Sequence, residues 1–366
     1  MKVVFRVDAS LLMGSGHVMR CLTLADVLRA AGVDCHFISR EHPGHLFAQI
    51  IQRGHGISML PAGSDSCDEE VSGPVHARWL GVGWADDAKQ TCEALVDLGA
   101  DWLVVDHYAI DARWERIVSG VCRNMMVIDD LADRAHECDL LLDQNLGQTA
   151  QAYEALVPAR CTVLAGAQFA LLRPEFAELR AESLFRRAQA QGALRDILVT
   201  MGGVDAANAS SYVLRALAGV VSPEMRITVV MGATAPWLAE VRQLVDGLPC
   251  TAEVLVNTTE MAKLMKESDL AIGAAGSTSW ERCCMGLPTL MVVVADNQRV
   301  AGRRIEETGA AVSFSLGDER YLQELVVRLK ESPAVLQAMS RSAAGITSGQ
   351  GCSLVVEKLF EIQRRG

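Results

Sequence analysis

The sequence has few aromatic residues and no excess of positive charge. Aromatic side chains make up 5% of its 366 residues, and the formal net charge is −11. A nucleic-acid-binding surface needs basic residues and aromatic side chains on which bases stack, and a membrane-surface patch needs lysine and arginine. We therefore expect neither nucleic acid nor a membrane among the partners of this protein.

Long hydrophobic runs are also missing. No run approaches the about 18 apolar residues that cross a bilayer, and the first ten residues, MKVVFRVDAS, lack the uncharged core of a signal peptide. The eleven cysteines contain no C-x-x-C pair, and Cys21, Cys35, Cys122 and Cys161 lie in apolar runs. This pattern is typical of buried free thiols in a cytoplasmic protein.

Several nucleotide and metal motifs are absent as well. The chain has no G-x-x-x-x-G-K-[ST] loop and no D-x-D pair, which excludes a P-loop and the two-aspartate metal site of many sugar-nucleotide transferases. The His42-Pro43-Gly44-His45 spacing resembles a pair of metal ligands, but no third ligand is near, and we interpret it as a solvated loop. We expect no metal ion and no cofactor.

Apolar, strand-like runs alternate with helical patterns over most of the chain. Continuous apolar strands separated by helices are typical of parallel sheets covered on both faces, and the length suits two domains. We therefore predict an α/β fold with two Rossmann-like domains facing a central cleft. The expected boundaries are 1–167 for the N-terminal domain, 168–350 for the C-terminal domain, and 351–366 for a final helix packing near the domain junction.

Twelve strands are predicted from these runs. They are Lys2–Val7, Asp34–Ser39, Ile57–Leu60, Trp102–Val105, Met125–Ile128, Leu140–Leu142, Ile197–Thr200, Ile227–Met231, Glu253–Val256, Leu270–Ile272, Thr289–Val294 and Val312–Phe314. Between the third and fourth strands, a helix over Asp86–Leu98 is expected to bury Ala88, Cys92, Leu95 and Val96 on one face.

The first strand leads into a glycine loop that opens a helix. Gly14, Ser15, Gly16 and His17 follow the strand that ends near Asp8, and a glycine loop at a helix start presents backbone N–H groups to an anion. The third glycine of a G-x-G-x-x-G fingerprint would fall on Met19, so the dinucleotide motif is incomplete. His17 has two interpretations, a residue that contacts the loop backbone or a general acid or base near a bound anion.

Small and hydroxyl residues follow two strands of the second half. Gly202 and Gly203 come after one strand, and Gly276, Ser277 and Thr278 come after another, with Glu281 one turn further on. Small side chains let a diphosphate approach the backbone, and hydroxyl groups add hydrogen bonds. Glu281 is suited to accept hydrogen bonds from ribose, or else caps its helix. A further polar strand end carries Asn297 and Gln298.

All eight histidines lie in the first half, where two more strands end in polar residues. One strand is followed by Asp106, His107 and Tyr108, and the next by Asp129 and Asp130. Since ligands of open α/β sheets bind beyond the carboxyl ends of the strands, we expect proton chemistry from the first domain and anion binding from the second.

The ordered set of motifs resembles a known family, the UDP-sugar hydrolases of pseudaminic acid biosynthesis. The motifs are Phe5–Ser10, Gly14–Leu22, Trp79–Val82, Asp106–Tyr108, Ile128–Asp130, Met201–Asp205, Gly276–Thr278 with Glu281, and Asn297-Gln298. The resemblance covers nearly the whole chain and implies a two-domain fold of the GT-B type.

The resemblance also implies an activity. Members of this family hydrolyse UDP-2,4-diacetamido-2,4,6-trideoxy-β-L-altropyranose to UDP and the free sugar without a metal ion. The resemblance implies that His17 is the general base that activates water and that Tyr108 lines the sugar pocket. It also implies that Glu281 holds the ribose and that Asn297 lies near the leaving group. We further expect substrate contacts from Asp8, Gly14, Ser15, Gly16, Asp129, Gly202, Gly203, Gly276, Ser277, Thr278 and Gln298.

Three other functions fit the same residues. They are a GT-B glycosyltransferase that uses a UDP-sugar, a UDP-N-acetylglucosamine 2-epimerase, and a sugar-nucleotide-binding protein without activity. The apolar patch flanked by basic residues that is usual in enzymes acting on lipid carriers is not evident. No obligatory protein partner is indicated. The stereochemistry of the sugar, the oligomeric state, the extent of domain closure and the roles of Asp106 and His107 stay open.

Overall fold

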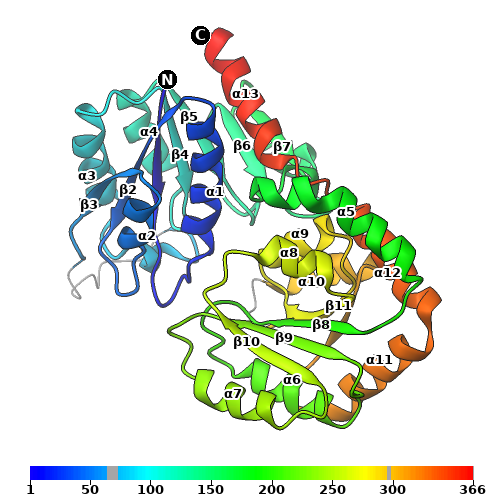
Figure 1. The fold of residues 1–366 in the computed structure, drawn as a ribbon. Helices are drawn as coiled ribbons and strands as arrows, with labels where there is room; N and C mark the ends of the chain where they lie inside the picture. The colour runs from blue at the N-terminus through cyan, green and yellow to red at the C-terminus, as the bar shows by residue number, and fades with distance from the viewer. Residues whose placement is uncertain (64–72, 295–297, 366) are drawn as a thin grey trace. The chain divides into compact units, whose positions relative to one another are not determined.

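The chain forms two compact units (Figure 1). The computed structural model describes residues 1–63, 73–294 and 298–365. The N-terminal unit consists of Met1–Leu171 together with Gln350–Gly366, and the C-terminal unit of Leu172–Gly349. Among the described residues, no helix combines the length and apolar character that a membrane span requires.

The N-terminal unit contains a seven-stranded sheet in the order β3-β2-β1-β4-β5-β6-β7, and its paired strands are parallel. The strands are β1 (Lys2–Val7), β2 (Asp34–Arg40), β3 (Gly56–Leu60), β4 (Trp102–Asp106), β5 (Asn124–Ile128), β6 (Leu140–Asp143) and β7 (Thr162–Ala165). The helices are α1 (Gly16–Ala30), α2 (Phe47–Gln52), α3 (Trp84–Val96), α4 (Ala112–Val118) and α13 (Gly351–Arg365), with short 3₁₀ turns at Ala77–Leu80, Ser119–Val121, Ala150–Tyr153 and Ala167–Phe169.

Both faces of this sheet are covered, as alternate residues of β1 show by belonging to two different apolar clusters. Val3 and Phe5 belong to the cluster that includes α1 and α13. Val4 belongs to the cluster that includes Leu95 of α3 and Trp114 of α4. Successive side chains of a strand point to opposite faces, so a continuous apolar run fits a strand buried on both sides.

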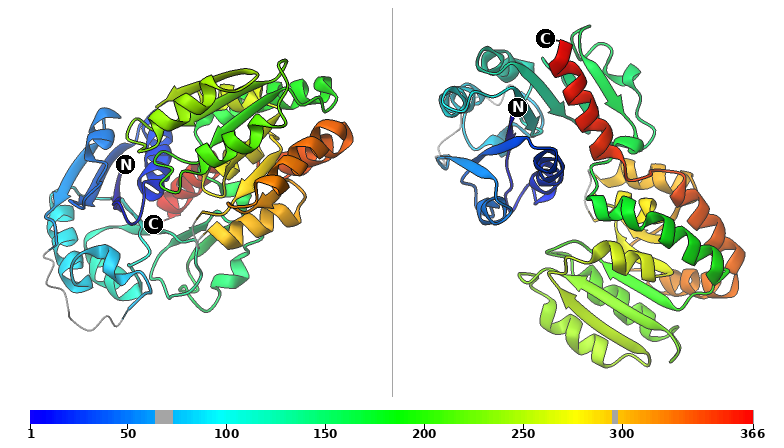
Figure 2. Two further views of the ribbon diagram at one scale, coloured as in Figure 1. Left: turned by 90° about the horizontal axis from the view of Figure 1, so that it is seen from below. Right: turned by 45° about the horizontal axis from the view of Figure 1, so that its top comes forward.

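Helix α13 completes the first of these clusters. It packs against α1, and Val355 and Leu359 are fully buried there. Figure 2 shows this helix, red at the C-terminal end of the chain, in two further views. The chain therefore returns to the N-terminal unit after it has formed the C-terminal one.

The C-terminal unit contains a six-stranded parallel sheet in the order β10-β9-β8-β11-β12-β13. The strands are β8 (Asp196–Thr200), β9 (Arg226–Met231), β10 (Thr251–Val256), β11 (Leu270–Ala274), β12 (Thr289–Val292) and β13 (Ala311–Phe314). The helices are α5 (Pro174–Ala190), α6 (Ala209–Ala218), α7 (Leu238–Asp246), α8 (Met261–Glu267), α9 (Thr278–Cys284), α10 (Arg299–Glu307), α11 (Glu319–Glu331) and α12 (Pro333–Ala344).

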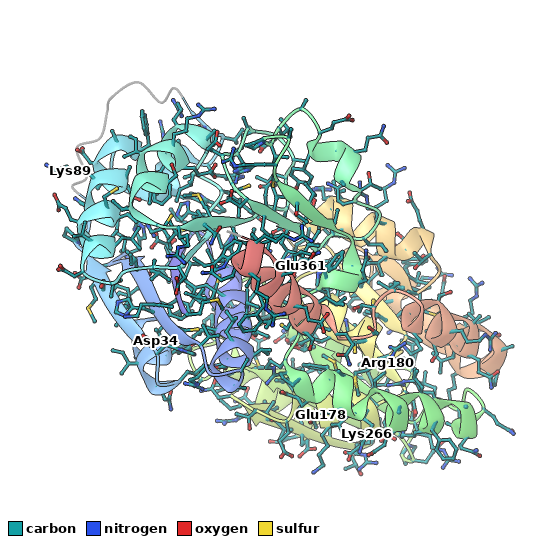
Figure 3. All side chains as sticks on the ribbon, turned by 90° about the horizontal axis from the view of Figure 1, so that it is seen from above. Asp34, Lys89, Glu178, Arg180, Lys266 and Glu361 are labelled. Atoms are coloured by element: carbon teal, nitrogen blue, oxygen red, sulfur yellow. The ribbon has the colours of Figure 1, made fainter. Side chains whose placement is uncertain are left out.

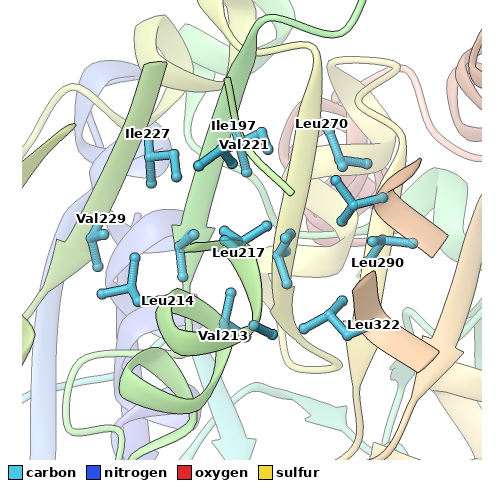
Figure 4. Close-up of a cluster of buried hydrophobic side chains, with 14 of the residues drawn as sticks. Ile197, Val213, Leu214, Leu217, Val221, Ile227, Val229, Leu270, Leu290 and Leu322 are labelled. Carbon is cyan, nitrogen blue, oxygen red and sulfur yellow. The ribbon is translucent and has the colours of Figure 1, made fainter. Parts of the chain in front are cut away.

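The core of the C-terminal unit is aliphatic. Ile197 of β8, Leu217 of α6 and Leu322 of α11 meet in one cluster, which Figure 4 shows in close-up. Charged side chains project from the ribbon, as Lys89 on α3 does in Figure 3. The fold therefore rests on apolar layers, and buried charged groups need a separate explanation.

The predicted strands are confirmed. Each of the twelve agrees with an observed strand to within about two residues at either end, and the α/β class with two Rossmann-like sheets is observed. The prediction that Val96 lies on the buried face of α3 is wrong. Val96 is 66% exposed, and Asp87 and Thr91 face inward in its place. The reason is a buried arginine, Arg6 of β1, whose Nη2 lies 2.6 Å from Oδ2 of Asp87.

Candidate functional site

In each sheet the strand order reverses next to the first strand of that unit. In the N-terminal unit β1 pairs with both β2 and β4, and in the C-terminal unit β8 pairs with both β9 and β11. The connections leave such a pair of strands in opposite directions, which opens a crevice at the carboxyl ends where ligands of α/β sheets bind. We call these two places the β1/β4 and β8/β11 switch points.

At the β1/β4 switch point, His17 pairs with Asp106. His17 lies in the first turn of α1 and is 8% exposed, and its Nδ1 lies 2.7 Å from Oδ1 of Asp106 at the end of β4. When the neutral imidazole donates its Nδ1–H to this carboxylate, Nε2 carries the lone pair and accepts a proton. The pair therefore has the arrangement of a general base held in one tautomer.

Arg20 ties the same carboxylate to a second one. Its Nε and Nη2 donate to the two oxygens of Asp106 at 2.6 and 2.7 Å, and its Nη1 donates to Oδ2 of Asp130 at 2.5 Å. Burial alone would raise the pKa of Asp106, but the charges of Arg20 and His17 hold it well below its usual range. Two carboxylates and one guanidinium leave one net negative charge, which a protonated His17 would balance.

Tyr108 forms an aromatic wall beside His17. The two rings meet edge to face with centroids 4.6 Å apart, and the Tyr108 hydroxyl donates to Oδ2 of Asp130 at 2.8 Å. Trp79 and His76 also pack near this ring, with ring centroids 5.8 and 5.5 Å from that of Tyr108. Burial raises the pKa of the Tyr108 hydroxyl, which keeps it a hydrogen-bond donor.

The loop before α1 is open at its glycines. Gly14 has a φ of 75°, a left-handed conformation that favours glycine. The helix cap Ser15 makes no side-chain hydrogen bond to the first turn. A Cβ added to Gly14 or Gly16 would meet no atom within 4 Å. These features leave the N-terminal N–H groups of the 15-residue helix α1 available to an anion.

Two of the carboxylates that we predict to contact substrate, Asp8 and Asp129, are fully buried in this structure. Asp8 is 0% exposed, lies 2.7 Å from Nη1 of Arg6, and accepts from the Arg40 backbone N–H at 2.7 Å. Its other oxygen faces Nε2 of His107 at 3.3 Å and Nε2 of His42 at 3.7 Å.

Asp129 is likewise 0% exposed and binds Nη1 of Arg134 and the backbone N–H of Ala132. Both carboxylates hold neighbouring loops in this structure. The interpretation of the His42 loop as solvated is wrong for His42 itself, since its side chain is 12% exposed and faces Asp8.

At the β8/β11 switch point, backbone donors lie open. Among the described residues, none accepts a hydrogen bond from the N–H groups of Gly202, Gly203, Gly276 or Ser277. Gly202 has a φ of 92°, and within the described part of the chain a Cβ added to Gly202 or Gly203 would meet no atom within 4 Å. Two neighbouring loops thus present unused donors, as sites for phosphate groups do.

Four further predicted residues lie in or near the second of these loops, namely Ser277, Thr278, Glu281 and Gln298. Glu281 is 17% exposed, and desolvation raises its pKa to about 7, although Arg173 lies 3.8 Å away. Oε1 of Gln298 accepts from the N–H of Val294, and a Cβ added to Gly276 would lie 3.8 Å from its Nε2. Ser277 is the N-cap residue of α9, and Thr278 is the first residue of that helix. Asn297 lies outside the described residues.

Metal-ligating residues do not gather within the described ranges. No group of three or more histidine, cysteine, aspartate or glutamate side chains there has the arrangement to hold a metal ion. The described cysteines form no disulfide, and of those predicted to be buried, Cys21 and Cys35 are buried while Cys122 and Cys161 are half-buried.

Comparisons with known proteins agree with this fold. Residues 197–351 match the glycosyltransferase family 28 C-terminal domain. The crystal structure of Acinetobacter baumannii MurG superimposes with a TM-score of 0.71 and 16% identity, covering 98% of this chain and 99% of that chain. The fold is GT-B. A UDP-GlcNAc 2-epimerase from Neisseria meningitidis, solved bound to UDP-GlcNAc, shares this fold with a TM-score of 0.59 and 11% identity over 99% of this chain and 100% of that chain.

The sequence comparison supports the predicted resemblance. The chain is 24% identical over 315 residues to the UDP-2,4-diacetamido-2,4,6-trideoxy-beta-L-altropyranose hydrolase of Campylobacter jejuni, which covers 86% of this chain and 99% of that protein. The similarity predicted from the ordered motifs is therefore confirmed, and it extends through both units of the GT-B fold.

Two charged residues of the GT-B units were not given a role from the sequence. Arg20 stands within a motif of the resemblance, but its partners are 86 and 110 residues away. Arg282 follows Glu281 on α9 and is 1% exposed. A long polar side chain on the apolar face of a helix is the one signal that marks such residues, and it does not identify the partner.

Proposed function

We propose that this protein hydrolyses UDP-2,4-diacetamido-2,4,6-trideoxy-β-L-altropyranose to UDP and 2,4-diacetamido-2,4,6-trideoxy-L-altrose, with His17 as the general base and without a metal ion. The observation that carries the proposal is the His17–Asp106 pair at the β1/β4 switch point. It stands in a chain that is similar over 86% of its length to a hydrolase of this substrate. We expect the reaction in the cytoplasm, where thiols stay reduced.

In the proposed reaction, Nε2 of His17 removes a proton from water. The water oxygen forms a bond to the anomeric carbon of the sugar, the bond from that carbon to the diphosphate oxygen breaks, and its electron pair leaves with UDP. Asp106 holds the imidazole in the reactive tautomer, and the negative charge of the Asp106–Arg20–Asp130 group favours the imidazolium that forms. General base catalysis of this kind contributes about 10²–10⁴-fold.

The C-terminal unit would bind the UDP part. The unused N–H groups at Gly202, Gly203, Gly276 and Ser277 are suited to the diphosphate, with the hydroxyls of Ser277 and Thr278 beside them. Glu281 would accept hydrogen bonds from the ribose, and Asn297 and Gln298 would lie near the leaving group. Tyr108 in the N-terminal unit would line the sugar pocket with its ring, since its hydroxyl is engaged by Asp130.

A glycosyltransferase is the second candidate, favoured by the TM-score of 0.71 to MurG and by the family 28 domain. In that reaction His17 would remove the proton from an acceptor hydroxyl in place of water. A 2-epimerase has the support of a lower TM-score, 0.59.

The deciding experiment is ³¹P NMR of the UDP-linked sugar incubated with EDTA-treated protein and no acceptor. We expect the signals of the sugar nucleotide to be replaced by those of UDP. An intact substrate, with UDP released only when an acceptor is added, would overturn hydrolysis in favour of transfer. Loss of the reaction on EDTA treatment, with recovery on adding Mg²⁺, would contradict the metal-free mechanism.

A further inference from the structure

Arg282 is a buried arginine directly beneath the Gly276–Thr278 loop. Its side chain is 1% exposed, and its Nη2 donates to the carbonyl oxygen of Ala274 at 2.7 Å and to Oγ of Ser279 at 2.9 Å. Nη1 lies 3.5 Å from Oγ1 of Thr278. These three partners all lie within residues 274–279, so the guanidinium is attached to this loop.

The guanidinium of Arg282 has no carboxylate partner among the described residues. No described aspartate or glutamate oxygen lies within 4 Å of it, and its Nε is buried without a hydrogen bond. Buried arginines are usually paired, because an isolated charge in the interior is costly. Arg20 of the N-terminal unit, by contrast, binds two carboxylates.

Strand β11 makes room for this charge. Gly273 lies in the strand, and a Cβ there would lie 2.4 Å from Nη1 of Arg282 and 2.7 Å from the backbone carbonyl oxygen of Thr200. Glycine inside a strand weakens it and often marks a close approach by another group. Glycine at position 273 therefore weakens β11 at the place where the guanidinium of Arg282 lies against it.

We propose that Arg282 is a positioning residue for diphosphate binding, which keeps the 274–279 loop in its donor-presenting form and adds behind it a positive charge that forms no ion pair within the described residues. This inference rests on the proposed function, because it assigns the β8/β11 switch point to the diphosphate of UDP. Arg282 itself does not touch the ligand. By drawing the Ala274 carbonyl and the Ser279 hydroxyl inward, it leaves the N–H groups of Gly276 and Ser277 without an internal acceptor.

The test compares UDP with uridine, which lacks the diphosphate. Dissociation constants of both are measured by NMR titration for the wild type, Arg282→Gln and Arg282→Lys. We expect Arg282→Gln to weaken UDP binding roughly tenfold, the order expected for one charge acting through protein interior, and to leave uridine binding unchanged. Arg282→Lys keeps the charge and should recover most of the preference for UDP.

Arg187 provides the matched control at the other end of the same strand. It is also a buried arginine that donates to carbonyl oxygens, those of Met265, Ser268 and Met285, and Ser268 precedes β11. Arg187→Gln should leave the ratio of the two dissociation constants at the wild-type value. If Arg282→Gln does not fold, Ser279→Ala replaces it, since it removes the hydroxyl oxygen to which Nη2 of Arg282 donates, and a smaller loss of UDP preference in the same direction is expected.

Three outcomes would overturn the inference. Neither ligand is weakened in Arg282→Gln, both ligands are weakened equally, or Arg187→Gln has the same effect as Arg282→Gln. In these cases the wild type still prefers UDP, so the proposed function stands. If the wild type binds UDP no better than uridine, this result would contradict both the proposed function and this inference.

Discussion

The two switch points have the same topology but differ in how their polar groups are paired. At β1/β4 the polar side chains are hydrogen-bonded to one another in one continuous network, which consists of His17, Asp106, Arg20 and Asp130. At β8/β11 the loops keep their backbone donors unpaired within the described residues, and a buried guanidinium lies beneath one of them. A group that transfers a proton needs fixed protein partners, whereas a group that binds an anion needs donors left for the ligand.

The strongest test of this comparison is His17→Asn. The side chain loses the nitrogen that accepts a proton from water, so turnover of the UDP-sugar should fall about 10³-fold, within the range of general base catalysis. The dissociation constant of UDP should stay within about twofold, because the donors of the C-terminal unit are untouched. Initial rates and UDP titration measure both. His45→Asn, at an exposed histidine, is the control, and a fully active His17→Asn would refute the assignment.

Asp106→Asn tests whether the carboxylate fixes the tautomer of His17. An amide at this position can donate to Nδ1 and thereby place the proton on Nε2, which then accepts none. Turnover should fall about 10²-fold or more, again with unchanged UDP affinity. Asp130→Asn should have the smaller effect because Asp130 contacts Arg20 and Tyr108 but not His17. Equal rates in the two variants would contradict the assigned roles.

Gly203→Val tests the open loop after β8. Apart from its chain neighbours, no described residue has an atom within 4 Å of a Cβ at Gly203, and its φ is not in the left-handed region. The melting temperature should therefore stay near that of the wild type, while UDP binding weakens about tenfold because the side chain fills the space of the diphosphate. Gly120→Val, also at an open glycine but in the N-terminal unit, is the control. Unchanged affinity in Gly203→Val would place the diphosphate elsewhere.

The smallest predicted effect is a pH dependence from Glu281. Its pKa is raised to about 7 by burial, so the carboxylate form, which accepts hydrogen bonds from both ribose hydroxyls, is lost as the pH falls through 7. UDP affinity should rise severalfold between about pH 6 and pH 8. The terminal phosphate also titrates near pH 6, so wild type and Glu281→Gln are compared at each pH. Identical pH profiles would exclude a ribose contact by this carboxylate.

The fold was predictable because its strands are continuous apolar runs separated by helical patterns. One strand, β7, was missed. It has four residues, of which only Leu164 is buried. Short strands at a sheet edge carry little hydrophobic signal. Val96 was misassigned because periodicity treats an apolar residue as buried and does not foresee that Asp87 is drawn inward by Arg6.

The candidate site was predictable in its loops but not in its pairings. Gly202, Gly276 and His17 follow strands, and the carboxyl ends of strands are readable from the sequence. His17 and Asp106, however, are 89 residues apart and meet only because β1 and β4 are neighbours in the sheet order. For the same reason, nothing in the sequence distinguishes Asp8 and Asp129, which are buried with arginine partners, from an aspartate open to substrate.

Helix α13 has a consequence for how the protein is made. The apolar cluster that contains Phe5 and Val18 is closed by Cys352, Val355 and Leu359, which are synthesised after the whole C-terminal unit. During translation the C-terminal unit has all its strands before the N-terminal unit has its last helix. The unit that carries His17 thus begins to emerge from the ribosome before the C-terminal unit and is completed after it, so an unfinished chain presents an exposed apolar face on α1 until α13 covers it.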